Sequence, residues 1–216
     1  MTMEIAALCL DGISDDCWEA LYPLLSGDRR KKADAIRARE RRRQSMAAGG
    51  LLEYLLKKNG VEEPFSYGAT DWGRPFLRSP GGENMEEKGL FFSLSHTKDL
   101  AVCALSDQPV GVDAEKIRPG RQKIVQRYFT KREQEEMARG DSEEMFFCIW
   151  TRKEAWAKKK DLPLLKVLEK KDELDGYSLT LRKNADVITV CSDCPIGART
   201  VDFISMEELL EGLKNH

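Results

Sequence analysis

Val110-Gly111-Val112-Asp113-Ala114-Glu115 lies where two halves of this sequence meet, each with a mixed pattern of helix and strand but with no repeat at the residue level. The valines that open it predict a strand. Before this stretch the sequence predicts helices followed by short strands, and after Pro119 the succession of helix and strand begins again. We therefore expect an α+β fold of two subdomains, residues 1–108 and residues 109–216.

Hydrophobic periodicity defines the other elements on either side of that stretch. Apolar residues at helical spacing predict a short helix over 14–25. Residues 26–58 favour helix behind a Ser26 N-cap, with Gly49-Gly50 as a break or a close-packing point. Asp141-Ser-Glu-Glu144 has the form of a capping box, and its helix should end near Asp161-Leu-Pro163. Strands are expected at 3–10, 65–67, 76–77, 90–95, 100–105, 110–115, 177–181, 187–191 and 200–204, before a closing helix from Met206.

Composition excludes several classes of protein. The 216 residues include 35 basic and 37 acidic side chains, so the net charge of −2 gives no overall field that would attract nucleic acid or an anionic membrane. The first ten residues lack the positive charge of a signal peptide, and no stretch approaches the ~20 apolar residues of a membrane span. We expect a cytoplasmic protein that acts without nucleic acid or membrane.

The six cysteines are spread through apolar segments, which suits reduced thiols better than a disulfide framework. Only Cys191-Ser-Asp-Cys194 has the spacing of metal ligands. A single pair of this kind is a weak indication of zinc, and we interpret it as a loop at the end of a strand.

Two carboxylates, Asp113 and Glu115, stand at i and i+2 of the predicted strand and should project from the same face. Like charges this close repel each other unless a cation lies between them, and hard oxygen ligands suit magnesium better than zinc or copper. Taken alone, however, the stretch is explained better by a solvated strand end, because Asp-x-Glu is common.

A second group lies in Trp150-Thr-Arg-Lys-Glu-Ala155 and the residues after it. On a helix, Trp150, Glu154 and Lys158 follow one another at i, i+4 and i+8 along one stripe. Glu154 could give a metal a third oxygen ligand, and Lys158 could reach a phosphate on that metal. For the isolated helix, a surface Glu–Lys pair beside a core tryptophan is the more frequent explanation.

Basic residues are densest between positions 29 and 43. Arg29 and Lys32 share one helical face, and Arg37, Arg39, Arg41, Arg42 and Arg43 follow. No aromatic residues lie between these charges, which weakens a nucleic-acid interpretation and leaves a phosphate-binding face or a solvated helix. His96, the only internal histidine, and Gly73-Arg74-Pro75, which has the form of a turn, indicate no function by themselves.

Four motifs taken in order resemble those of Sfp-type 4'-phosphopantetheinyl transferases. They are Gly73-Arg-Pro75, Phe92-Ser-Leu-Ser95-His96, Gly111-Val-Asp-Ala-Glu115 and Trp150-Thr-Arg-Lys-Glu-Ala155 with Lys158. Four motifs in register are far more specific than any one of them. The resemblance covers roughly residues 26 to 160, and the length is that of the monomeric, pseudo-dimeric branch. It implies two similar α+β subdomains related by a pseudo-twofold, with coenzyme A and Mg²⁺ bound between them.

The resemblance also implies an activity and a role for each matched residue. The expected reaction moves 4'-phosphopantetheine from coenzyme A to a serine of an apo acyl or peptidyl carrier protein, giving the holo carrier and 3',5'-ADP. Asp113, Glu115 and Glu154 match the metal ligands. Glu154 is also the candidate base, directly or through a water, and Lys158 should contact the transferred phosphate. The positions matched to coenzyme A binding are Arg29, Lys32, Ser45, Arg74, Ser95, His96, Asp113 and Lys158.

Two departures from the family pattern and two rival functions stay open at this point. Ser93 stands where asparagine is common, and 158–164 lacks the usual glycine-rich turn, which leaves the carrier and the tolerance for acyl groups undetermined. A catalytically silent coenzyme A or nucleotide-binding module is one alternative, although such a protein should have lost one of the three acidic residues. A basic-helix nucleic-acid protein is the other, and its binding should weaken steeply with salt.

Overall fold

The computed structural model describes residues 3–119, 122–169, 174–197 and 201–214. Within these ranges the helices are α1 Asp15–Leu21, α2 Gly27–Asp34, α3 Arg39–Lys58, α4 Gln122–Tyr128, α5 Lys131–Met137, α6 Ser142–Lys159, α7 Leu164–Glu169 and α8 Met206–Lys214, with short 3-10 helices at Tyr22–Leu24 and Met85–Lys88. The strands are β1 Glu4–Cys9, β2 Ser66–Ala69, β3 Pro75–Arg78, β4 Phe91–His96, β5 Leu100–Ser106, β6 Val110–Lys116, β7 Tyr177–Lys183, β8 Asp186–Ser192 and β9 Val201–Ile204.

The two principal sheets repeat one topology. In the first, β1 is followed by the long helix α3 and then by β4 and β5, and the strands lie in the order β4-β5-β1. In the second, β6 is followed by the long helix α6 and then by β7 and β8, in the order β7-β8-β6. All of these pairings are antiparallel. The expected α+β fold is confirmed, while the pseudo-twofold and the boundary at residues 108 and 109 stay predictions.

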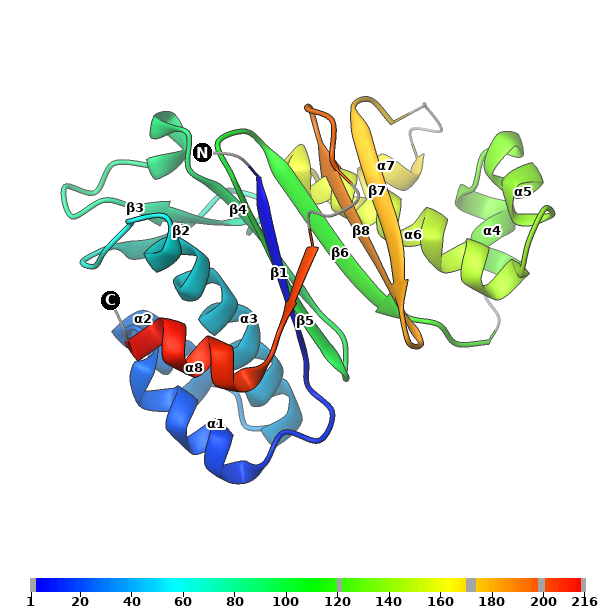
Figure 1. Cartoon of the computed structure of the whole chain (residues 1–216). Helices are drawn as coiled ribbons and strands as arrows, with labels where there is room; N and C mark the ends of the chain where they lie inside the picture. The colour runs from blue at the N-terminus through cyan, green and yellow to red at the C-terminus, as the bar shows by residue number, and fades with distance from the viewer. Residues whose placement is uncertain (1–2, 120–121, 170–173, 198–200, 215–216) are drawn as a thin grey trace.

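The last elements of the chain return to the first sheet. β9 pairs in parallel with β1, and α8 packs against α3. Figure 1 shows the result: α1, α2, α3 and α8 lie at one end of the molecule, α4 to α7 lie at the other, and the two sheets lie between them. Residues 201–214 therefore pack with the N-terminal unit although they follow the second unit in the sequence.

Alternating side chains bury both faces of the first sheet. In β1, Ala6 and Leu8 join the apolar core under α3, whereas Ile5 and Ala7 point into a second core. That second core also contains residues of β5, β6 and β8, so the two sheets pack against each other through it. Because successive residues of a strand face opposite ways, one strand serves both cores.

Two serines of β4 join it to β6 beside that core. Ser93 Oγ accepts a hydrogen bond of 3.0 Å from the Val112 N–H, and Ser95 Oγ accepts one of 3.1 Å from the Ala114 N–H. Both serines are buried. Side-chain hydroxyls thus satisfy amides of β6 at an edge where none of the described strands pairs with it, and they fix the register between the two sheets.

A glycine lets the long helix of the second unit approach β6. A Cβ atom at Gly111 would lie 1.8 Å from the Ala155 carbonyl oxygen and 2.7 Å from the Lys159 backbone nitrogen. Only a residue without a side chain fits between the strand and the helix at this point. The close approach places α6 directly over β6.

The element boundaries agree with the sequence-based expectations except in two places. The helix expected over 26–58 is two helices, and its break lies at 35–38, not at Gly49-Gly50, which proves to be a close-packing point. No residue in 35–38 is a helix breaker, so tertiary packing of α2 against α3 imposes the break. The helix α7 was not predicted. Thr200, expected to begin the last strand, lies outside the described residues.

Replacing Ser93 with alanine should destabilise the protein, because the buried Val112 N–H would lose its acceptor. We expect the free energy of unfolding to fall by about 1–3 kcal/mol, measured by urea denaturation. Ser178, exposed on β7, is the matched control. Ser178→Ala should change the stability by less than about 0.5 kcal/mol, and equal losses in the two variants would refute a special role for Ser93.

Gly111→Ala should lower the free energy of unfolding more than Ser93→Ala does, because the added methyl group collides with backbone atoms of α6 that cannot rotate away. A loss of about 3 kcal/mol or more is expected in the same denaturation assay. Gly27, at the start of α2, is the matched control, because a Cβ atom added there would have no other atom within 4 Å. Gly27→Ala should therefore stay within about 1 kcal/mol of the original protein. A Gly111→Ala protein of unchanged stability would contradict the close packing described here.

Candidate active site

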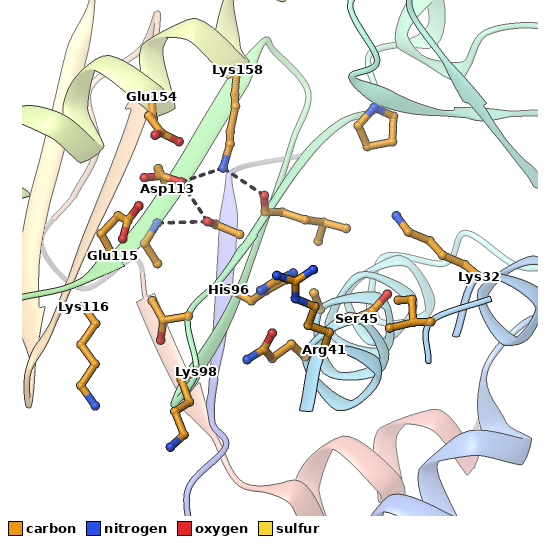
Figure 2. A pocket seen from close by; sticks show the side chains of 18 of the residues that line it. Lys32, Arg41, Ser45, His96, Lys98, Asp113, Glu115, Lys116, Glu154 and Lys158 are labelled. Atoms are coloured by element: carbon orange, nitrogen blue, oxygen red, sulfur yellow. Dashed lines mark hydrogen bonds and ion pairs between the residues drawn. The ribbon is translucent and has the colours of Figure 1, made fainter. Parts of the chain in front are cut away.

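A cavity of about 940 Å³ lies between the two units. Its walls come from α2, α3, β4, β6 and α6. Figure 2 shows the acidic side chains on one side, together with Lys158 and Lys116, and Lys32 and Arg41 across from them. Of the residues expected from the sequence, those that line it are Arg29, Lys32, Ser45, Ser95, His96, Asp113, Glu115, Glu154 and Lys158. Segments that are far apart in the sequence therefore converge at one place.

Asp113 is the most deeply buried carboxylate of the site, at 3% exposure. Its Oδ1 atom accepts hydrogen bonds from Ser95 Oγ at 2.9 Å and from Lys158 Nζ at 2.8 Å. Its Oδ2 atom is buried without a hydrogen-bond partner. A buried carboxylate oxygen left in this state is costly, and a cation would remove the cost.

Lys158 lies where the two sheets meet. Its ammonium group also donates to the Leu94 carbonyl at 3.3 Å and to the Val112 carbonyl at 2.9 Å. The side chain therefore bridges β4 and β6 while it remains 31% exposed to the cavity. Three acceptors fix the position of its positive charge beside Asp113 (Figure 2).

Glu154 lies one helical turn before Lys158 on α6 and also lines the cavity. Burial, together with repulsion from Asp113 and Glu115, raises the pKa of Glu154 to about 7 in spite of the opposing charge of Lys158. Glu115 extends toward the cavity from β6 and forms an ion pair of 3.0 Å with Arg118. The expected carboxylates thus share one wall.

The carboxylates of the acidic wall do not form a complete metal-binding site in the described residues. Within the described part of the chain, no three His, Cys, Asp or Glu side chains are arranged to hold a metal ion. The donor chemistry nevertheless fits a hard divalent cation, because the wall offers carboxylate oxygens, an unpartnered Asp113 Oδ2 and a Glu154 carboxylate destabilised by its neighbours. Glu115 would have to share its carboxylate with Arg118 to join such a site.

The opposite wall is cationic. Burial and the nearby charge of Arg29 lower the pKa of Lys32. Burial, and then the charges of Lys158 and Lys32, lower the pKa of His96. Neighbouring positive charges that disfavour protonation in this way indicate a positive potential, which favours the binding of a polyanion. Ser45, on α3, adds a hydroxyl to this wall.

Arg74 does not line this cavity. Its guanidinium pairs with both carboxylate oxygens of Glu86 and lies 3.5 Å from Asp161 Oδ1. It borders a smaller neighbouring cavity of about 250 Å³, which shares Pro75, Leu94 and Lys158 with the main one. The structure thus separates Arg74 from the other expected coenzyme A residues, and its role in binding stays an untested prediction.

The sequence reasoning missed several lining residues. On α3, Arg41 and Gln44 lie on the same helical face as Ser45 and Ala48, because the four residues are spaced i, i+3, i+4 and i+7. Following this face from Ser45 would have identified both residues. Lys98, Lys116 and Arg118 also line the cavity, and they stand close in sequence to expected residues. Proximity to the motifs was the signal that could have revealed them.

The remaining basic residues of the N-terminal segment lie elsewhere. Arg39 and Arg43 both pair with Asp15, and Arg42 pairs with Asp34 at 2.9 Å. Acidic neighbours therefore accompany these surface charges. Cys191 lies in the end of β8 and Cys194 in the loop after it, as expected. No described helix is both long and apolar enough to span a membrane.

Comparison with known proteins points to one family. A family model described as the 4'-phosphopantetheinyl transferase superfamily matches residues 109–184. The 4'-phosphopantetheinyl transferase HetI of Nostoc is 33% identical over 64% of this chain and 60% of HetI, less than two thirds of that relative. The 4'-phosphopantetheinyl transferase Sfp of Bacillus subtilis is 25% identical over 96% of this chain and 100% of Sfp. The Bacillus pumilus transferase psf-1 is 26% identical over 91% of each chain. Three of the four ordered motifs bring polar side chains to the main cavity, and these matches support an Sfp-type 4'-phosphopantetheinyl transferase, the family that the chain resembles over nearly its whole length.

Proposed function

We propose that this protein transfers the 4'-phosphopantetheine group of coenzyme A to a serine hydroxyl of an apo acyl or peptidyl carrier protein. The products are the holo carrier protein and 3',5'-ADP. The observation that carries the proposal is the placement of Asp113, Glu154 and Lys158 on one wall of a cavity whose other wall is cationic. Coenzyme A has a pyrophosphate and a 3'-phosphate, and such a polyanion matches that division of charge.

The basic wall is proposed to bind the nucleotide end of coenzyme A. Arg29 and Lys32, with Ser45 and His96, would hold the 3'-phosphate and its neighbours. Ser95 donates to Asp113, and Asp113 pairs with Lys158, so these two residues would orient the Lys158 ammonium group toward the pyrophosphate. Fixing the substrate at several points orients the phosphorus atom for attack.

Asp113, Glu115 and Glu154 are proposed to hold Mg²⁺. Among their oxygens, Asp113 Oδ2 is buried and has no hydrogen-bond partner in the described residues, which suits it as a ligand. When bound, the ion supplies positive charge that offsets the charge of the pyrophosphate. The support for this step is the chemistry of the carboxylate donors and the unpartnered oxygen.

The reaction breaks one phosphoanhydride bond and forms one phosphoester bond. The serine oxygen of the carrier attacks the phosphorus atom that bears pantetheine, and 3',5'-ADP leaves with the electron pair of the broken P–O bond. Glu154 accepts the serine proton. Lys158 places its ammonium group where negative charge develops on the transferred phosphate, and the three acceptors around it hold it there before the reaction.

One chain supplies both walls of the cavity, which supports action as a monomer. All six cysteines are free, as is usual in a reducing compartment, and this supports a place in the cytoplasm.

The test of the proposal is the intact mass of an apo acyl carrier protein and an apo peptidyl carrier protein after incubation with this protein, coenzyme A and Mg²⁺. Each accepted carrier should gain the mass of one phosphopantetheine at its serine. EDTA should abolish the gain and excess Mg²⁺ should restore it, because the metal offsets charge in the reaction. Coenzyme A binding without any mass gain on either carrier would favour the silent binding module instead.

Glu154→Gln should lower kcat by about 10²–10⁴, because the amide cannot accept the serine proton. The rate is measured as holo carrier formed per minute at saturating coenzyme A and Mg²⁺. Glu208→Gln, the same substitution on the remote helix α8, is the matched control and should keep the original rate. A Glu154→Gln enzyme that is as fast as this control would remove Glu154 from the mechanism.

A further inference from the structure

Arg29 is buried at 5% exposure, yet two of its nitrogen atoms have no hydrogen-bond partner. These atoms are Nε and Nη2, whose N–H groups lie parallel along one edge of the guanidinium. That edge is the one that grips two oxygens of a phosphate at once. Because Arg29 also lines the cavity, a phosphate group bound there would supply the acceptors that these two buried donors lack.

Two neighbours restrict the side chain of Arg29. The guanidinium carbon lies 4.1 Å from the centroid of the Tyr67 ring, which is stacking distance. The aliphatic stem passes over α3 at Gly49, where a Cβ atom would lie 2.8 Å from Arg29 Cδ. A ring that contacts the guanidinium carbon supplies no acceptor to the Nε–H and Nη2–H groups, whereas an ordinary ion pair would occupy them.

Tyr67 is itself fixed in place. Its hydroxyl donates to Glu53 Oε1 at 3.3 Å, and Glu53 Oε2 accepts from the Ser26 N–H at 3.0 Å. Ser26 is the N-cap of α2, the helix that carries Arg29. The buried Glu53 therefore ties the ring on β2 to the start of the helix whose side chain the ring supports.

The surroundings of the ring are aromatic and rigid. Phe65 and Phe92 pack edge-on against Tyr67, with centroids at 5.9 Å and 6.4 Å. Phe92 is fully buried on β4. The ring is thus held by packing on its edges and by a hydrogen bond at its hydroxyl, and it is a stable platform for the guanidinium.

We propose that Tyr67 is a positioning residue that holds the unpartnered Nε–Nη2 edge of Arg29 in place beside the cavity, so that Arg29 binds a phosphate monoester dianion of the substrate. The inference rests on the proposed function, in which that dianion is the 3'-phosphate of coenzyme A. Tyr67 acts through Arg29 and does not touch the substrate. Glu53 and Gly49 contribute by fixing the ring and by leaving room for the arginine stem.

The experiment compares coenzyme A with dephospho-coenzyme A, which differs only in lacking the 3'-phosphate, by isothermal titration calorimetry. Tyr67→Leu should weaken coenzyme A binding roughly tenfold and leave dephospho-coenzyme A within about twofold. Tyr67→Phe keeps the ring and is the matched control, so it should keep most of the discrimination. In turnover assays Tyr67→Leu should raise KM for coenzyme A while kcat at saturation stays unchanged.

Two further variants separate positioning from a general loss of structure. Gly49→Ala should reduce the discrimination in the same direction, because the methyl group displaces the arginine stem. In an Arg29→Ala background, Tyr67→Leu should cause no additional loss, since the ring then has nothing to position. Thermal melting of each variant confirms that it is folded at the temperature of the titration.

The inference is overturned if Tyr67→Leu weakens both ligands equally, or neither, or if its effect persists without Arg29. The proposed function fails in a different way. An original protein that prefers coenzyme A to dephospho-coenzyme A but modifies no carrier would contradict the transferase proposal and leave the role of Tyr67 intact. An original protein that binds neither compound would contradict both.

Discussion

The ion pair between Asp113 and Lys158 is the interaction on which the rest of this structure depends. It joins a strand of the second sheet to the helix that covers that sheet, and the same ammonium group reaches the carbonyl of Leu94 in the first sheet. Ser95 completes the junction by donating to Asp113 and accepting from the amide of Ala114. Removing Lys158 would leave the buried charge of Asp113 uncompensated, so the pair helps to fix how the two units meet.

That junction also explains why the cavity is divided by charge. Asp113 uses one oxygen to hold Lys158 and Ser95, which leaves the other oxygen for a ligand. Asp113 and Glu115 repel the Glu154 carboxylate, and a cation bound between these groups would offset the repulsion. Across the cavity, Lys32 and His96 are both less easily protonated than free side chains, because burial and neighbouring charges work against them. A ligand of opposite charge would therefore lower the electrostatic free energy of each wall.

Close approach of backbone segments is the second constraint. Gly111 brings α6 onto β6, and Gly49 lets the Arg29 side chain cross α3. Both glycines lie within regular elements, where this residue costs stability relative to alanine, so their value lies in the contact that they permit. The acidic wall depends on the first contact and the arginine edge on the second. Small residues at two crossing points therefore set the geometry of a cavity lined mainly by large polar side chains.

The sequence alone determined the α+β character, most of the strands, and which charged side chains share one face of β6 and one face of α6. The i, i+2 spacing of Asp113 and Glu115 and the i, i+4 spacing of Glu154 and Lys158 are local, because they depend only on whether the residues form a strand or a helix. Only the tertiary structure decided the break at 35–38, the pairing of Arg74 with Glu86 outside the cavity and the stacking of Tyr67 beneath Arg29. These features depend on packing between separate elements, and such packing leaves no periodic pattern in the sequence.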